Sequence, residues 1–347
     1  MRFAIVTIGV TALVAAGIAW GGAWAALAVA SITVFAWALD RIAALSAPDR
    51  AGQEFPSGAA LSVALGLAHF PILFGAVAAL ASEGHGTLDK ALIFVAASLF
   101  IGQVGNANAH ELIHRKRRAM RLLGAAVYAS ILFGHHASAH LRVHHVHAAS
   151  AGDPNSARLQ EGFYSYAVRA WAGSFRAGWR AERRLRGGRG RHPYWGYGAG
   201  SVASLTVAAA LGGGAGIAAL LAIAVYAQAQ LLLSDYVQHY GLRRRRREDG
   251  RLEPVGPQHS WNAPHGFTSA MMLNAPRHSD HHARPARAYP GLELDREAMP
   301  MLPHSLPVMA VIALLPPLWF RVMDKRALAW SPDADPAVPD GAPVAAA

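Results

Sequence analysis

The chain lacks cysteine and has few charged residues. Because none of its 347 residues is cysteine, a disulfide framework, a thiolate metal site and a cysteine nucleophile are all excluded. Only 15% of the residues are charged, whereas a soluble domain carries about 25%. A glycine-rich phosphate loop and a dinucleotide-binding fingerprint are also missing. Since 53% of the residues are hydrophobic, the composition is that of an integral membrane protein.

Six apolar segments predict six transmembrane helices. A membrane helix needs roughly 20 predominantly apolar residues. Segments of this kind occupy about 3–20, 22–39, 58–80, 90–109, 199–214 and 216–237. The first two are joined by Gly21 and Gly22 alone, which predicts a tight helical hairpin. Residues 121–138 are apolar but short, which favours a re-entrant or interfacial helix. We therefore expect an all-α membrane protein.

Clusters of arginine and lysine predict the orientation in the membrane. The clusters "HRKRRAMR", "RAERRLRGGRGRH" and "LRRRRRED" follow the fourth span, precede the fifth and follow the sixth. Such clusters stay on the cytoplasmic side, so both termini are predicted to be cytoplasmic, at a bacterial inner membrane. A cleaved signal peptide over residues 1–20 is disfavoured, since Arg2 is its only charge and the apolar run continues to Leu39.

The remaining polar segments predict a cap on this bundle. We expect one membrane-embedded domain over residues 1–329, with its cytoplasmic cap formed by residues 110–198 and 238–329. Residues 330–347 are rich in proline, alanine and aspartate, a composition typical of a disordered tail.

Nine of the eighteen histidines stand in four clusters with the spacing of metal ligands. They are His110 and His114 in "HELIH", His140, His144 and His145 in "HLRVHH", His239 in "DYVQHYG", and His278, His281 and His282 in "RHSDHHARP". Two histidines four residues apart share one helix face and can bind one ion. A third histidine directly after such a pair, as in the triplet His140, His144 and His145, points in another direction, which favours two adjacent ions.

The number of histidines also indicates two ions, because a tetrahedral zinc takes only four ligands. Imidazole ligands suit iron, copper, nickel or zinc, so they leave the metal open. All four clusters lie on the predicted cytoplasmic side, where they would cap an apolar pocket. The other histidines have a plainer interpretation. His69 is expected in the core or pocket, His85, His192 and His304 in loops, and His135, His136 and His147 beside the ligands.

The motifs resemble those of the integral-membrane alkane 1-monooxygenases, within the wider fatty acid desaturase and hydroxylase superfamily. The resemblance runs from about Asp40 to Trp330 and rests on "HELIHRK", "RVHHVHAASAGDPNSAR", "HSWNAPH", "RHSDHHARPARAYPGL" and "PPLWFRVMD". It implies a non-haem di-iron centre held by the same nine histidines. It further implies hydroxylation of the terminal methyl of an alkane with O₂, and electrons from rubredoxin or ferredoxin with its reductase. The expected partners are a hydrophobic substrate from the bilayer and membrane lipids, with no nucleic acid.

Five positions depart from the family pattern. Ala139 and Val143 stand where the family usually has Glu and Gly, Gln238 replaces Glu, and Asn274 and Pro276 replace His and Gln. Residues that hydrogen-bond to metal ligands tune the metal. Two alternatives therefore stay open: desaturation of a fatty acyl chain, and hydroxylation of another apolar molecule such as an aromatic methyl group or a terpene.

Acidic residues near the clusters have predicted supporting roles. Glu111, inside "HELIH", would orient a ligand or relay protons. Asp280 would accept an N–H from a ligand imidazole, and Asp153 and Asp235 are weaker candidates for that task.

Aromatic residues of the second and third spans are candidates for the substrate channel. They are Phe35, Trp37, His69 and Phe70, in segments whose many Ala and Gly residues permit close helix packing.

Two other functions fit part of the pattern. "HELIH" also matches an intramembrane zinc protease with Glu111 as general base, although that function leaves seven clustered histidines without a role. A metal transporter would place its ligands near the bilayer midplane, whereas these clusters lie outside the predicted spans.

Overall fold

The computed structural model describes residues 2–42 and 58–331, and its regular elements are helices. The first half contains α1 (Arg2–Trp20), α2 (Gly22–Ile32), α3 (Val34–Asp40), α4 (Ala59–Ala81), α5 (Thr87–Phe100), the π-helix η2 (Ile101–Gly105), α6 (Asn106–Ile113), α7 (Arg118–Ser130), α8 (His136–Ala139), the π-helix η3 (His140–His144) and α9 (His145–His147). The second half contains α10 (Phe163–Arg186), α11 (Pro193–His239), η4 (Pro257–His259), α12 (Gly266–Met271), α13 (His278–Ala283), η5 (Tyr289–Gly291), α14 (Leu306–Ala313) and α15 (Pro316–Trp330). In the described ranges no strand forms, so the all-α prediction is confirmed.

Within residues 2–42 and 58–331, five helices are long and apolar enough to cross a membrane. They are Arg2–Trp20, Gly22–Asp40, Ala59–Ala81, Thr87–Ile113 and Pro193–His239. The second comprises α2 and α3, and the fourth runs without interruption through α5, η2 and α6. The first four agree with the predicted segments, whereas the two segments predicted over 199–214 and 216–237 both fall within α11.

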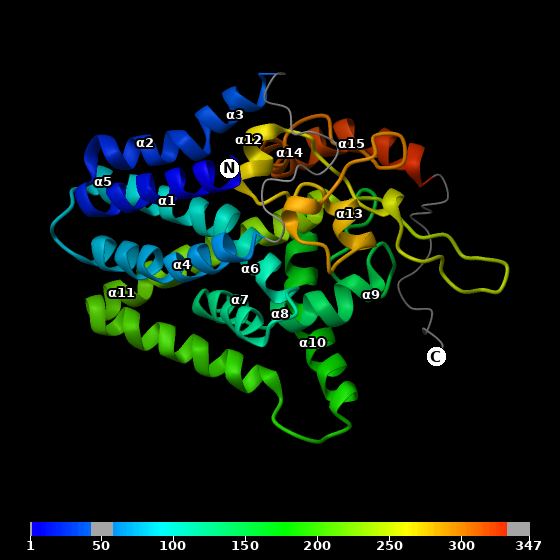
Figure 1. The fold of residues 1–347 in the computed structure, drawn as a ribbon, viewed down its shortest axis with the longest axis horizontal. Helices are drawn as coiled ribbons and strands as arrows, with labels where there is room; N and C mark the ends of the chain where they lie inside the picture. The colour runs from blue at the N-terminus through cyan, green and yellow to red at the C-terminus, as the bar shows by residue number, and fades with distance from the viewer. Residues whose placement is uncertain (1, 43–57, 332–347) are drawn as a thin grey trace.

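Helix α11 turns back on itself at a glycine pair. Gly213 has φ 57° and ψ −134°, a conformation open essentially only to glycine, and the preceding Gly212 is also non-helical. A Cβ on Gly216 would lie 2.1 Å from the carbonyl oxygen of Ala208. In a straight helix these residues would be about 12 Å apart. The two predicted segments are therefore the legs of one helical hairpin, which Figure 1 shows folding back at the end of the bundle.

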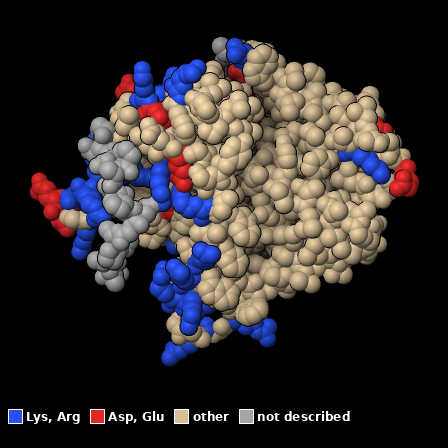
Figure 2. Space-filling model, turned by 180° about the vertical axis from the view of Figure 1, so that it is seen from behind, with Lys and Arg blue, Asp and Glu red and all other residues tan. Residues whose placement is uncertain are grey.

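Basic residues gather at one end of the bundle. The turn between α1 and α2 meets the α4–α5 loop at the other end, where the N–H of Gly22 donates to Asp89 at 2.8 Å. Figure 2 shows most lysines and arginines on the end away from this small charged group, with a broad surface of uncharged residues between. This separation is what a membrane-embedded bundle requires. Which side of the membrane the basic end faces stays a prediction.

The helices after α11 form a cover over the basic end of the bundle (Figure 1). Helices α14 and α15 have no counterpart among the predicted helices. The ring of Trp319 on α15 is fully buried, and its centroid lies 5.3 Å from that of Tyr236 and 5.2 Å from that of Tyr240. This contact fixes the end of α11, where His239 stands. The segment predicted as a short helix over 121–138 is divided between α7 and α8. The predicted tail, from 332 onward, lies outside the described residues.

Candidate metal centre

The nine clustered histidines converge in space as two groups. The first group contains His110, His114, His140, His145 and His281, and the second contains His144, His239, His278 and His282. Within each group, one ring nitrogen from every histidine lies within 4.8 Å of those of the others. Because the groups draw on α6, η3, α9, α11 and α13, segments up to 172 residues apart (282 minus 110) meet at this one place.

Ring nitrogens face one another at short distances in both groups. In the first, the Nε2 atoms of His140 and His145 are 2.9 Å apart, and those of His145 and His281 are 3.1 Å apart. In the second, the Nε2 atom of His278 lies 3.0 Å from that of His239 and 3.1 Å from that of His282. A metal–imidazole bond of about 2.1 Å separates ligands at right angles by about 3 Å, so this spacing fits metal ligands.

The π-helix η3 determines how the three histidines His140, His144 and His145 are divided between the two groups. In an α-helix His140 would face the same way as His144, four residues on. The wider turn of η3 instead brings His140 together with His145, five residues on, and sends His144 to the second group. Such π-turns occur mostly at functional sites. The prediction that this triplet serves two adjacent ions agrees with this geometry, but the pairing differs from the one that α-helical spacing gives.

Helix α13 also contributes to both groups. His278 and His282 are one helical turn apart and both belong to the second group, while His281 points to the first. Because a single short helix places three histidines in two directions, it connects the two groups. His110 on α6 and His114, the residue directly after α6, lie in the same group, as their spacing predicts.

The environment keeps most of these imidazoles neutral; the exception is His144, whose pKa is raised because the nearby Asp153 outweighs the effect of burial. Burial, followed by the neighbouring imidazoles, lowers the pKa of His140, His281 and His282 well below 6.5. Neutral imidazole is the form that binds a metal ion. In addition, the Nε2 atoms of His110 and His114 are buried and have no hydrogen-bond partner among the described residues. A cation bound by the first group would satisfy these two lone pairs. The facing Nε2 atoms of His239, His278 and His282 offer the same kind of donor in the second group, so the residues present fit two metal ions.

Asp153 holds one of the histidines from outside the groups. Its Oδ2 accepts from His144 Nδ1–H at 2.9 Å and from the hydroxyl of Ser156 at 2.7 Å, and its Oδ1 accepts from the N–H of Asn155 at 3.0 Å. Although burial raises the pKa of Asp153, His144 and these hydrogen bonds outweigh it and lower the pKa to about 2. The ionised carboxylate therefore keeps the proton of His144 on Nδ1 and leaves Nε2 for a metal.

The two carboxylates predicted as supporting residues have other contacts. Glu111 is buried, pairs with Arg115 at 2.5 Å and accepts from the N–H of Tyr289 at 3.3 Å. Asp280 pairs with Arg287 at 3.2 Å and with Arg284 at 3.5 Å. Among the described residues, both carboxylates therefore pair with arginines, and neither forms a hydrogen bond with an imidazole.

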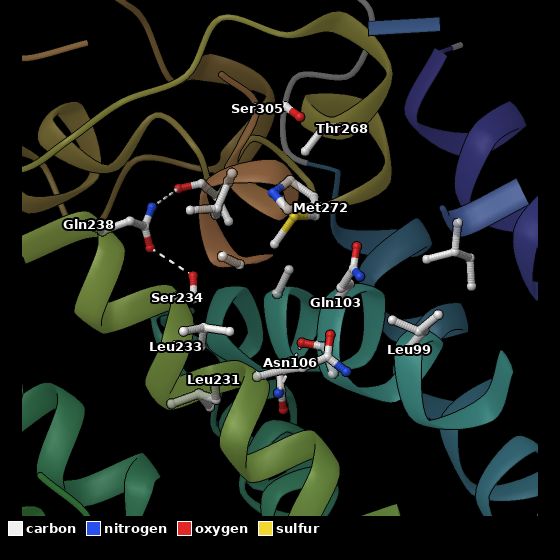
Figure 3. A pocket seen from close by; sticks show the side chains of 18 of the residues that line it. Leu99, Gln103, Asn106, Leu231, Leu233, Ser234, Gln238, Thr268, Met272 and Ser305 are labelled. Carbon is white, nitrogen blue, oxygen red and sulfur yellow. Dashed lines mark hydrogen bonds between the residues drawn. The ribbon is translucent and has the colours of Figure 1, made fainter. Parts of the chain in front are cut away.

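A cavity of about 580 Å³ reaches the histidine groups, and Figure 3 shows part of its lining. The lining includes His110, His140 and His278, which represent both groups. It also includes exposed apolar side chains, among them Trp37 and Val311. The cavity therefore connects exposed apolar surface with the clustered histidines.

One of the four predicted channel residues lines this cavity. Trp37 does so, whereas Phe35, beside it on α3, is 45% exposed on the outer surface. His69 is buried and its Nε2 lies 2.9 Å from the hydroxyl of Ser130, with Phe70 against its ring at 5.4 Å. Neither of the latter two is among the lining residues.

Hydrogen bonds account for two of the departures from the family pattern. Gln238 Nε2 donates to the carbonyl oxygen of Ala275 at 3.0 Å, a bond that an ionised glutamate at this position does not make. Asn274 has φ 57°, a left-handed conformation that asparagine tolerates well, and its Nδ2 donates to the carbonyl oxygen of Tyr289 at 2.8 Å. Both amides fix the segment that leads into α13.

The fold and the site define the class of protein: an integral membrane protein in which a helical bundle carries two adjacent histidine groups suited to metal ions. The chain belongs to the fatty acid desaturase family, whose sequence profile matches residues 89–312.

Several characterised proteins are similar to this chain. Alkane 1-monooxygenase 2 of Alcanivorax borkumensis is 31% identical over 278 residues, which is 78% of this chain and 72% of that protein. Alkane 1-monooxygenase 1 of Pseudomonas aeruginosa is 34% identical over 77% of this chain and 73% of its own length. The hydroxylase component of a xylene/toluene monooxygenase from Pseudomonas putida is 27% identical over 63% of this chain and 59% of that protein.

Proposed function

We propose that this protein is a membrane monooxygenase that hydroxylates the terminal methyl group of an alkane-like chain with O₂ at a di-iron centre. The observation that carries the proposal is that histidines of both groups line one apolar cavity. Side chains alone do not break an unactivated C–H bond; two bound iron ions with O₂ supply that oxidising power. The similarity to two alkane 1-monooxygenases supports the choice of substrate class.

The protein's own residues hold and shield this chemistry. Five histidines would bind one ion and four the other, while Asp153 keeps His144 in the tautomer that presents Nε2. The apolar residues that line the cavity, among them Trp37 and Leu231, would bind the hydrocarbon chain of the substrate and exclude water from the reacting carbon. We further infer that the basic end, with both termini, faces the cytoplasm of a bacterial inner membrane, where soluble electron donors are available.

A second candidate is hydroxylation of an aromatic methyl group, which the similarity to the xylene/toluene enzyme favours. A zinc protease is disfavoured because His110 and His114 belong to a group of five histidines and Glu111 pairs with Arg115.

Product analysis tests the proposed function. Cells that express the full chain with a rubredoxin and its reductase are given decane, decanoic acid or a xylene, and the products are identified by mass spectrometry. We expect 1-decanol from decane, and two iron ions per purified chain. A new double bond in decanoic acid with no alcohol from decane identifies a desaturase instead. Hydroxylation of xylene alone favours the second candidate.

Exposed arginines beside the metal centre suit an acidic electron donor. Burial is the main reason that the pKa of His147, two residues after His145, lies below 6.5, and the half-buried Arg244 after α11 and the exposed Arg184 near the end of α10 lower it further. Arg183 and Arg184 are exposed at the end of α10. We infer that rubredoxin or ferredoxin, the donor that the family resemblance implies, docks on this surface by charge attraction.

Reversing these charges should weaken docking. In Arg183→Glu/Arg184→Glu we expect the KM for the reduced donor to rise about fivefold at low salt, because steering is electrostatic, and to depend less on salt than in the unchanged protein. The measurement is steady-state turnover against donor concentration at two ionic strengths. Lys90→Glu, at the other end of the bundle, is the control and should change neither quantity. An unchanged KM in the double variant would place the donor elsewhere.

A further inference from the structure

The apolar cavity contains a polar site that a plain hydrocarbon does not need. Gln103 in η2 and Asn106 at the start of α6 both line it. Figure 3 shows them on neighbouring turns, with Ser234 on α11 across the cavity. Both are well buried, with exposed fractions of 9% for Gln103 and 6% for Asn106.

The orientation of the Asn106 amide is fixed by its donors. Its Nδ2 donates to the carbonyl oxygens of Gly102 at 3.1 Å and Ala227 at 3.0 Å. The other amide atom is therefore the oxygen, and Asn106 Oδ1 has no hydrogen-bond partner among the described residues. Gln103 Oε1 is likewise buried without one. Ser234, by contrast, donates to Gln238 Oε1 at 3.0 Å.

Two unpartnered amide oxygens in an apolar cavity favour a ligand with its own polar group. A buried acceptor without a donor is destabilising, and an alkane that fills the cavity would leave both oxygens in this state. A hydroxyl group suits the pair, because it can donate to Asn106 Oδ1 and accept from the amide nitrogen of Gln103. The amides are neutral, which matches a neutral ligand group. Asn106 precedes His110 by four residues, or about 6 Å along the helix axis.

We propose that Gln103 and Asn106 form a hydroxyl-binding subsite, so that the cavity binds a hydrophobic alcohol more tightly than a hydrocarbon of similar size. The proposal deepens the proposed function and rests on it, since it concerns the same cavity. It is tested by binding alone, so its outcome is independent of turnover.

The test is a competition for tritiated 1-decanol bound to the full chain in lipid nanodiscs. The competitors are 1-decanol, 1-methoxydecane and undecane, which are similar in size. The ether accepts hydrogen bonds without donating them, and the alkane does neither. We expect 1-decanol to compete about tenfold better than either of the others, in line with the discrimination that one or two hydrogen bonds provide.

Two variants locate this preference. Gln103→Leu removes a side chain with no protein hydrogen bond in the described structure, and Asn106→Leu removes the fixed acceptor. Each should bring the alcohol-to-alkane ratio close to one while undecane binding is retained. Asn108→Leu is the matched control, because Asn108 is a buried asparagine of the same helix that does not line the cavity; the ratio should persist there.

The outcomes separate the two proposals. Equal binding of decanol and undecane to the unchanged protein, or an unchanged ratio in Gln103→Leu, overturns the subsite. If the alcohol preference is present but neither alcohol nor alkane is oxidised in cells, the proposed function fails while the subsite stands.

Discussion

We expect that replacing His281 by alanine abolishes hydroxylation and weakens metal binding in the first histidine group only. His281 is one of the five histidines of that group and lies on the short helix that carries His278 and His282 of the other. The loss of activity should exceed the roughly 100-fold that removal of an outer neighbour of a ligand costs. The reason is that the alanine leaves an open position in the group and nothing else in the described structure replaces the imidazole.

The companion variant His278→Ala tests the division into two groups. It removes one of only four ligands from the second group, so we expect it to lose its ion more readily than His281→Ala does. The measurement is iron per chain after a fixed exposure to a chelator, which should fall from two towards one in either variant. The outcome that contradicts the assignment is two tightly held ions with full activity in either variant.

A histidine outside both groups provides the control. His192 stacks on Trp179 with ring centroids 4.0 Å apart and belongs to neither group. His192→Gln should keep two irons and full activity, which separates loss of a ligand from the loss of any histidine.

Sequence spacing identified the histidines but not how they are shared. The nine histidines predicted from their spacing in the sequence are the nine that lie together in the structure. The reason is that the spacing of residues along a helix determines which way their side chains point. The assignment of His145 rather than His144 to the group of His140 depends on the extra residue in the turn of η3. A π-turn depends on tertiary packing, and the local sequence does not predict it.

The supporting carboxylates were harder to rank, because their contacts depend on long-range folding. Asp280 stands between two ligands in sequence, yet its carboxylate pairs with Arg287. Asp153 lies nine residues after His144, and the loop between them brings the two side chains together. The apolar segments were readily predicted from composition. The reversal of α11 at Gly213 could also be predicted from the sequence, because the two predicted spans meet at a cluster of glycines.

Asp153→Asn should lower hydroxylation about 10- to 100-fold, the usual cost of losing an outer hydrogen-bond partner of a metal ligand. Both carboxylate oxygens of Asp153 act only as acceptors: Oδ2 receives His144 Nδ1–H and the Ser156 hydroxyl, and Oδ1 receives the N–H of Asn155. An asparagine presents an NH₂ group in place of one oxygen. That group faces donors in either orientation, so at least one hydrogen bond is lost.

The expected effect is on positioning, and the kinetics should show this. If the NH₂ group faces His144, the imidazole tends to turn or to move its proton to Nε2, which then no longer binds a metal. The kcat should fall and iron should be lost from the second group, while the KM for the substrate stays within about twofold of the unchanged protein's, because Asp153 does not line the cavity.

Asp280→Asn is the matched comparison, since Asp280 is equally buried but pairs with arginines. We expect it to lower kcat by less than about threefold, because those arginines are partly exposed and such pairs contribute little. A larger loss in Asp280→Asn than in Asp153→Asn would reverse the assignment and make Asp280 the residue that orients a ligand. A small loss in both would show that the histidine groups hold their geometry without either carboxylate, through the rigidity of η3 and α13 alone.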